Sequence, residues 1–180
     1  MWKKIKKKRR LLLISLFVLL GMIIFNFWLN SAYYAIHSKY TSQDEVPGII
    51  VDHLDDVMYD VKEEYFGDYF LQVDGKKSIN YKLTDSEERV LSQESIGLSD
   101  YYYRKKEEGK GYRYNLDKNM AIIDSYLSIN GGLFQSHKAT AEEQEKVREE
   151  LNELIKPLLK RVTKPFINLQ WLYDFIFREH

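Results

Sequence analysis

The sequence predicts an α+β fold: an antiparallel β-meander of five or six strands with an N-terminal helix and two C-terminal helices on one face, preceded by a single transmembrane helix. Three observations lead to this prediction. An uncharged apolar run follows a block of cations near the N-terminus. Apolar residues then recur every three or four positions, next alternate along the middle of the chain, and finally return to helical spacing. The 180 residues have room for about one domain.

The charge of the chain is distributed unevenly. The chain has 27 basic and 27 acidic side chains. Seven of the basic residues and no acidic one lie in residues 1–10, and residues 11–29 are uncharged, so the remainder holds 20 basic and 27 acidic residues. This acidic remainder argues against nucleic-acid binding, which needs clustered cations to neutralise phosphate. The absence of Cys excludes disulfide scaffolds and thiol redox chemistry.

Residues 11–29 are expected to form the transmembrane anchor. They include 16 apolar residues out of 19, and at about 1.5 Å per residue they nearly cross a hydrocarbon core of roughly 30 Å. The cationic residues 1–10 are expected in the cytoplasm, which places the rest of the chain outside. A cleaved signal peptide would have a shorter apolar region and a small-x-small cleavage site, whereas the sites after Ala32 and Ala35 have a polar or a bulky residue two positions upstream.

The outer region is expected to begin with a short stalk, and the alternative is that the membrane helix continues into this segment. Residues 30–46 are polar and contain several Tyr, and residues 47–180 are expected to form the extracellular α+β domain. The first helix of this domain is expected from Pro47 to Tyr65, where apolar residues fall at steps of three and four. Its opposite face is acidic, and the acidic residues just before Pro47 suit a helix start.

The hydrophobic period changes to two from Asp68 onward, which predicts the meander. The Asp74-Gly75, Glu108-Gly109 and Asn130-Gly131 pairs suit the positive φ angles of tight hairpin turns. The expected strands are Tyr69–Val73, Lys77–Leu83, Arg89–Ser95, Tyr101–Glu107, Gly111–Asp117 and Met120–Ile129, with a further short one at Leu133–Ser136.

Helical spacing returns near the C-terminus. The sequence Thr140-Ala-Glu-Glu143 is a capping box that starts a helix with an apolar stripe. Pro157 is expected to bend or interrupt this helix. A last helix is expected after Pro165, with Leu169 and Leu172 on its apolar face.

Few residues suggest catalysis. The four His lack the spacing of a metal pair, and neither a nucleophile elbow nor a phosphate-binding loop is present, so we expect no enzyme activity, no metal and no cofactor. Asp52, Asp55, Asp56 and Asp60 share a face of the expected helix, which fits either a calcium site or, more simply, a solvated surface. A hydrolase with a carboxylate pair is a third hypothesis, although nothing selects two of the 27 acidic residues.

The tyrosines are more informative. Tyr101 and Tyr103 share one face of a strand by alternation, as do Tyr112 and Tyr114 on the next strand. If they point away from the helices, they form an aromatic surface suited to a protein partner, and if they point toward the helices, they belong to the core. The candidate partner-binding residues are Tyr101, Tyr103, Tyr112, Tyr114, Asp52, Asp55 and Asp56.

A Lys-rich N-terminus, one apolar span, the segment Ala32-Tyr-Tyr-Ala-Ile-His-Ser-Lys-Tyr and a Cys-free outer region with Tyr-Phe-Gly-Asp-Tyr-Phe at residues 65–70 resemble the TipC family of streptococcal immunity proteins. The resemblance implies a protein tethered outside a Gram-positive cell that neutralises a secreted LXG-type toxin. The toxin attacks the cell-wall precursor lipid II, and the immunity protein binds it with a concave sheet surface. It supplies no catalytic residues. The alternative is a non-enzymatic cell-envelope accessory protein that binds wall polymer or a secretion or signalling partner.

Overall fold

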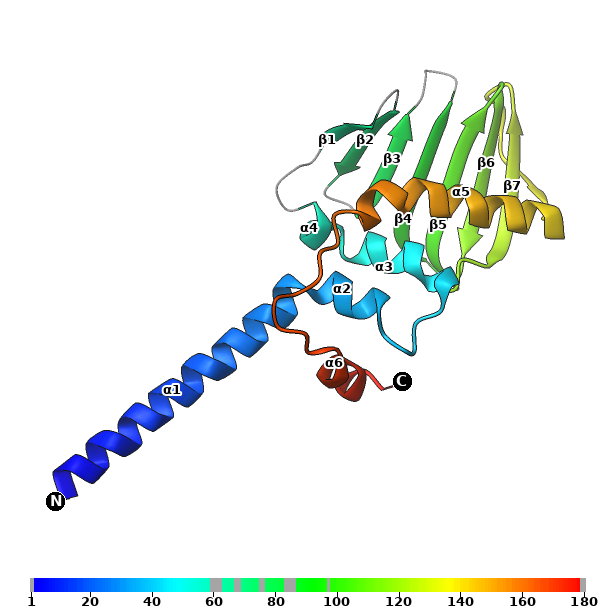
Figure 1. Cartoon of the computed structure of the whole chain (residues 1–180). Helices are drawn as coiled ribbons and strands as arrows, with labels where there is room; N and C mark the ends of the chain where they lie inside the picture. The colour runs from blue at the N-terminus through cyan, green and yellow to red at the C-terminus, as the bar shows by residue number, and fades with distance from the viewer. Residues whose placement is uncertain are drawn as a thin grey trace.

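The computed structural model describes residues 2–58, 63–66, 69–74, 77–82, 87–96 and 98–178. One long helix, α1 (Trp2–Leu29), projects from a domain in which helices cover one face of a sheet (Figure 1). Its part Lys8–Leu29 is long and apolar enough to cross a membrane, and none of its apolar window is buried against the domain. A bare apolar surface of this size on a single helix is unfavourable in water, which is consistent with membrane association.

The sheet is an antiparallel meander, which confirms the predicted fold class. Every strand pairs with its neighbour in the chain, in the order β1 to β8. The described residues form eight strands where five or six were expected: β1 was not predicted, and β8 overlaps the further short strand expected at Leu133–Ser136. The strands are β1 (Glu63–Phe66), β2 (Tyr69–Asp74), β3 (Ser78–Lys82), β4 (Glu88–Ile96), β5 (Ser99–Glu107), β6 (Lys110–Leu116), β7 (Ile122–Ile129) and β8 (Gln135–His137).

The helix expected from Pro47 to Tyr65 is shorter than predicted. It consists of α3 (Val46–Asp52) and α4 (Leu54–Val57), which are separated at His53. Residues 63–66 instead form β1, which pairs with β2 through Tyr65 and Phe70. One i, i+4 step between Val61 and Tyr65 is too short a pattern to outweigh the backbone pairing that a sheet edge offers.

The segment 30–46, expected to be a stalk, is folded onto the domain. It contains α2 (Ser31–Ile36) and the 3-10 turn η1 (Gln43–Glu45). Ala32, Tyr34 and Ala35 of α2 are buried. The domain therefore follows α1 without an extended spacer, and α2 lies directly beside α3.

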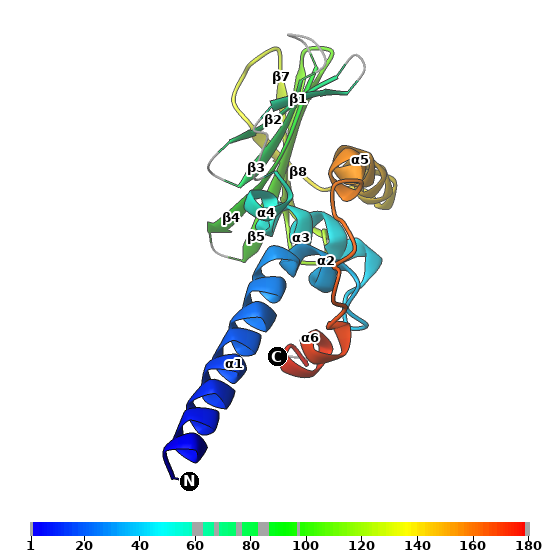
Figure 2. The same cartoon turned by 60° about the vertical axis from the view of Figure 1, so that its left-hand side comes forward.

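The C-terminal part of the chain adds two helices. α5 (Ala141–Leu159) begins at the predicted capping box, in which the Glu143 backbone N–H donates to Thr140 Oγ1 at 3.1 Å. It continues through Pro157, because a proline two residues from the helix end removes only one hydrogen bond of the last turn. α6 (Gln170–Ile176) packs beside α2, close to the end of α1 (Figure 2).

The main core lies between the helix-bearing face of the sheet and the pair α3 and α5 (Figure 2). Gly48 of α3 sits against Tyr101 of β5, since a Cβ at this position would lie 2.8 Å from the Tyr101 ring and from the Met120 side chain. The fully buried residues of this core include Ile50, Ile79, Leu91, Tyr103, Leu116, Leu151 and Ile155.

Two helices are joined to β5 by polar contacts that are shielded from water. The Tyr101 hydroxyl donates to Asp52 Oδ2 of α3 at 2.8 Å, and the Tyr103 hydroxyl donates to Glu150 Oε2 of α5 at 3.1 Å. Lys105 Nζ donates to the other oxygen of Glu150 at 2.9 Å, with both side chains buried. A charge-assisted pair of this kind fixes α5 in register with the strand.

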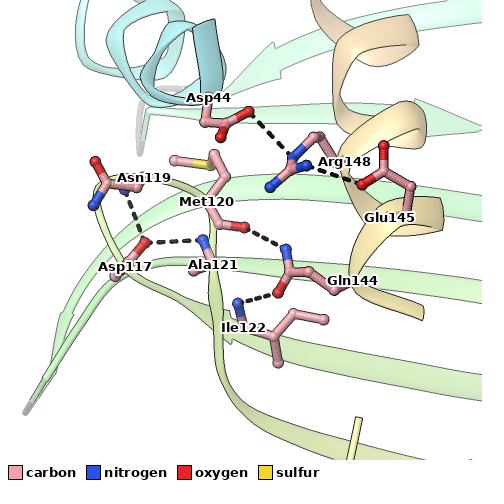
Figure 3. Close-up of polar contacts among 9 residues, drawn as sticks. All are labelled: Asp44, Asp117, Asn119, Met120, Ala121, Ile122, Gln144, Glu145 and Arg148. Carbon is pink, nitrogen blue, oxygen red and sulfur yellow. Dashed lines mark hydrogen bonds and ion pairs between the residues drawn. The ribbon is translucent and has the colours of Figure 1, made fainter. Parts of the chain in front are cut away.

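The turn from β6 to β7 is held by α5 from one side (Figure 3). Asp117 Oδ1 accepts backbone hydrogen bonds from Asn119 and Ala121 at 2.8 and 2.9 Å. Gln144 of α5 bonds both the Met120 carbonyl and the Ile122 backbone N–H. These bonds satisfy the backbone where the strand pairing is interrupted, and they compensate for the left-handed conformation of Met120, whose φ is 59°.

Breaking the buried pair on one side should destabilise the domain strongly. Lys105→Met leaves the Glu150 carboxylate buried without its cation, so we expect the free energy of unfolding to fall by about 3–5 kcal/mol. Urea unfolding of the full chain in detergent micelles, followed by near-ultraviolet circular dichroism, measures this change. The double variant Lys105→Met/Glu150→Leu should lose less, because it removes the stranded charge. Equal losses in the two variants would show that the pair does not hold α5.

Candidate functional site

The four candidate tyrosines lie on the face of the sheet that bears the helices. Tyr101, Tyr103 and Tyr114 are buried and Tyr112 is half-buried. The strand register places Tyr103 opposite Tyr114, and their rings stack with centroids 6.2 Å apart. The core alternative therefore describes these residues, and in the folded domain α3 and α5 stand between them and any partner.

The hydroxyls of the three buried tyrosines, Tyr101, Tyr103 and Tyr114, have raised pKa values and stay protonated above the ordinary range. Burial, reinforced by the Asp52 carboxylate, raises the pKa of Tyr101 above its ordinary value of 10.0. Burial and the Glu150 carboxylate likewise raise the pKa of Tyr103. Burial also raises the pKa of Tyr114, with Glu143 and Glu150 adding to the effect. These hydroxyls therefore act as neutral hydrogen-bond donors and not as general bases at neutral pH.

The three candidate carboxylates have separate roles. Asp52 accepts the Tyr101 hydroxyl bond, while its Oδ1 atom is buried without a hydrogen-bond partner. Asp56 Oδ2 accepts a bond from the Ser31 hydroxyl at 2.6 Å and lies 3.2 Å from His53 Nδ1. Asp55 is exposed. The break between α3 and α4 separates Asp52 from the other two, and Asp60 lies outside the described residues.

Among the residues that the structure describes, which do not include Asp60, no three His, Asp or Glu side chains come together in a group that would hold a metal ion. Asp55 is the one solvated carboxylate of the three described, because Asp52 and Asp56 accept hydrogen bonds from Tyr101 and Ser31.

One groove lies where α1 meets the domain. It has a volume of about 740 Å³ and is lined mainly by the end of α1, by α2 and by the chain after α5. Asp55 and Asp56 lie on one wall, with Trp28 and Arg161 among the other lining residues. Arg161 donates to the Val57 carbonyl at 3.2 Å, so its guanidinium ties the loop after α5 to α4.

The opposite face of the sheet carries no helix of the described residues (Figure 2). Alternation places on it the neighbours of the buried tyrosines, notably Tyr102 and Arg104 of β5. The register aligns Arg104 with Arg113 of β6, and Arg113 with Tyr126 of β7. We call these four residues, Tyr102, Arg104, Arg113 and Tyr126, the open-face cluster.

The side chains of the open-face cluster are organised. The guanidinium carbon of Arg113 lies 5.4 Å from the centre of the Tyr102 ring, a cation–π distance. Arg104 forms an ion pair with Glu88 of β4 at 3.4 Å. Tyr and Arg are the residues that contribute most at the centres of protein interfaces. The arrangement has the composition of a binding surface, without a nucleophile or an acid–base pair in the cluster.

The sequence contained a signal for this cluster, but it was ambiguous. Tyr101-Tyr102-Tyr103 places an aromatic residue on both faces of β5, and Arg104-Lys105-Lys106 places a cation on both faces. Alternation shows which residues share a face without showing which face is buried. Lys105 is buried although its neighbours Arg104 and Lys106 are exposed. Both faces of β5 therefore carry a cation, and polarity does not show which face is buried.

Comparisons with known proteins do not assign the chain to a family or a function. No family model, no curated protein and no solved structure matches the chain.

The raised tyrosine pKa values predict a loss of stability at alkaline pH. A phenol with a raised folded-state pKa contributes stability that is complete below the unfolded value of 10.0 and declines as the pH rises above it. We therefore expect the urea midpoint to stay nearly constant up to about pH 9.5 and to fall steadily between about pH 10 and pH 12. Tyr101→Phe should show a shallower decline than the parent chain, since one buried phenol is gone. A urea midpoint that does not change over this pH range would contradict the raised pKa values of the buried tyrosines.

Proposed function

We propose that the chain is a membrane-anchored extracellular immunity protein that binds and neutralises a secreted LXG-type toxin acting on lipid II. The observation that carries the proposal is the uncovered sheet face with its open-face cluster, in a domain attached directly to an apolar helix. An inhibitor needs a rigid, complementary surface and no catalytic group. The resemblance to the TipC family assigns binding to a sheet surface, and the face without helices is the one available for it.

Anchoring by an uncleaved α1 is supported by the way the helix joins the domain. Asn26 Nδ2 donates to the Tyr34 hydroxyl at 2.8 Å, and the Phe27 ring packs on Tyr34. Ala32 and Ala35, the small residues nearest the end of the apolar run, are buried within α2. Signal peptidases cut accessible segments, so this burial favours retention of the helix. The cationic residues 1–10 favour a cytoplasmic N-terminus.

The location gives the proposed inhibitor an advantage over a soluble one. A domain tethered to the membrane meets a toxin that attacks a membrane-bound precursor at a high effective concentration. The modest binding energy of a small surface is then sufficient, because the encounter is confined to the layer where damage occurs.

The charges on the open face indicate how a partner would be recognised. Among the described side chains of β4 to β7, the cations Arg104, Lys106 and Arg113 share this face with the carboxylates Glu88, Asp100 and Asp124. The acidic excess of the outer region lies elsewhere, for instance on the exposed side of α5. Recognition would therefore depend on individual pairs formed with Arg and Tyr side chains more than on a long-range field.

The proposal is tested by toxin challenge of cells that carry variants of this chain. Deletion of its gene should sensitise the cells to one cognate toxin, and expression of the parent chain should restore survival. Arg113→Glu and Tyr102→Ala should abolish protection and weaken toxin binding by roughly 30-fold or more, the effect of losing an interface residue worth about 2 kcal/mol.

Lys146→Glu is the matched control for the charge reversal, since Lys146 is exposed on α5. This variant should protect as well as the parent chain. Survival of the deletion strain in the same challenge would overturn the proposal. Binding of the purified chain to peptidoglycan, with none to the toxin, would instead favour the cell-envelope accessory protein.

A further inference from the structure

The segment that contains α6 exposes an unusual amount of apolar surface. Trp171 is 69% exposed and Phe166 is fully exposed. Exposed large apolar residues elsewhere in the described domain are spread over separate turns and strands, such as Leu98 and Leu133. Those in residues 166–177 occur within one short stretch, and they are Phe166, Ile167, Trp171, Phe175, Ile176 and Phe177.

This segment is fixed to the end of α1 by hydrogen bonds. The Ile167 carbonyl accepts from Asn26 Nδ2 at 3.2 Å and from the Tyr34 hydroxyl at 2.9 Å. Asn26 lies three residues before the end of α1, which is about 4.5 Å along the helix axis. The carbonyl of Ile167 is therefore level with the last turn of the apolar helix.

α6 itself is held in the same place through Tyr34. The side-chain amide of Gln170 donates to the Tyr34 carbonyl at 2.9 Å, and the Tyr173 ring stacks on the Tyr34 ring with centroids 5.9 Å apart. Tyr34 is completely buried. The contacts thus use the side of α6 that faces the domain, and Trp171 and Phe175, one helical turn apart, remain on the other side.

The orientation of α6 is the reverse of that of an ordinary surface helix. A helix on a soluble domain turns its apolar side inward and its polar side to water. Both views show α6 on the side of the domain from which α1 projects, beside the end of that helix (Figures 1 and 2). If α1 crosses a bilayer, α6 lies at the level of the lipid headgroups. Trp and Phe side chains are favoured in this region.

We propose that residues 165–177 form a second membrane contact, an interfacial segment that inserts Phe166, Trp171 and Phe175 into the outer surface of the bilayer crossed by α1. The bilayer is the occupant that the geometry favours, because the exposed apolar side chains lie beside the end of the membrane helix, to which Asn26 bonds the segment. The exposed cations Lys164 and Arg178 flank the segment and suit lipid phosphates. The inference rests on the anchoring part of the proposed function and is independent of the toxin.

The test uses site-directed spin labels, which the Cys-free chain allows without background. The full chain is reconstituted in vesicles of phosphatidylcholine and phosphatidylglycerol with a single Cys at one of four positions. Phe166→Cys and Phe175→Cys report on the segment, and both positions are exposed, although a label at Phe175 replaces the contact of its ring with Arg178. Val18→Cys, in the middle of α1, marks the lipid interior, and Leu133→Cys, 90% exposed in the turn before β8, marks water.

Accessibility to oxygen and to a water-soluble nickel chelate is measured for each label. We expect the labels at Phe166 and Phe175 to be at least several-fold less accessible to the chelate than the label at Leu133, with oxygen access between those of Leu133 and Val18. Chelate access equal to that of Leu133, with Val18 in lipid, would overturn the inference and leave the anchor intact.

Two further outcomes also contradict the inference. A water-exposed label at Val18 would remove the anchor on which both this inference and the proposed function depend. Dipolar broadening between labels at Phe175, with low access to both reagents, would show that a second copy of the chain covers the segment instead of lipid. A charge substitution adds an independent readout: Trp171→Glu should return the Phe175 label to chelate access close to that of Leu133.

Discussion

The arrangement of the domain depends on the helix-facing row of β5, in which Tyr101, Tyr103 and Lys105 reach across the core to the two covering helices. Apolar packing alone would let α3 and α5 slide over the sheet, because dispersion contacts have little directionality. The bonds to Asp52 and Glu150 remove this freedom. They also make one face of β5 a structural surface, which leaves only the other face of the strand for recognition.

The sequence predicted the class of fold correctly, since alternating and helical periods were long enough to be distinguished in β4 to β7 and in α5. It failed where a pattern was short or where polar residues were buried. Residues 63–66 contain too few positions to show a period, and the segment 30–46, expected to be a polar stalk, contains Tyr34, which is buried beside the end of α1. The sequence left open whether the candidate tyrosines of β5 point toward the helices or away from them. The structure buries Tyr101 and Tyr103 on the helix-bearing face together with Lys105, a cation whose burial is explained by Glu150, 45 residues later.

The absence of a stalk changes how the proposed activity is understood. Because α2 follows α1 directly and packs against α3, the domain is not joined to α1 by a flexible linker. Two attachments to one bilayer, α1 and the segment around α6, would set the angle at which the open-face cluster meets an incoming protein. Orientation, together with concentration, then contributes to capture, since less rotational freedom is lost on binding.

The meander has a consequence for how the chain folds. Each strand pairs with the one made just before it, so the sheet grows by local contacts that close quickly. The helix that completes the core comes near the end of the chain, and until it docks, Lys105 and the rings of Tyr103 and Tyr114 are uncovered. The order of the elements along the chain means that all the strands are synthesised before α5, and the segment that carries Glu150 is needed to cover the inner face of the sheet.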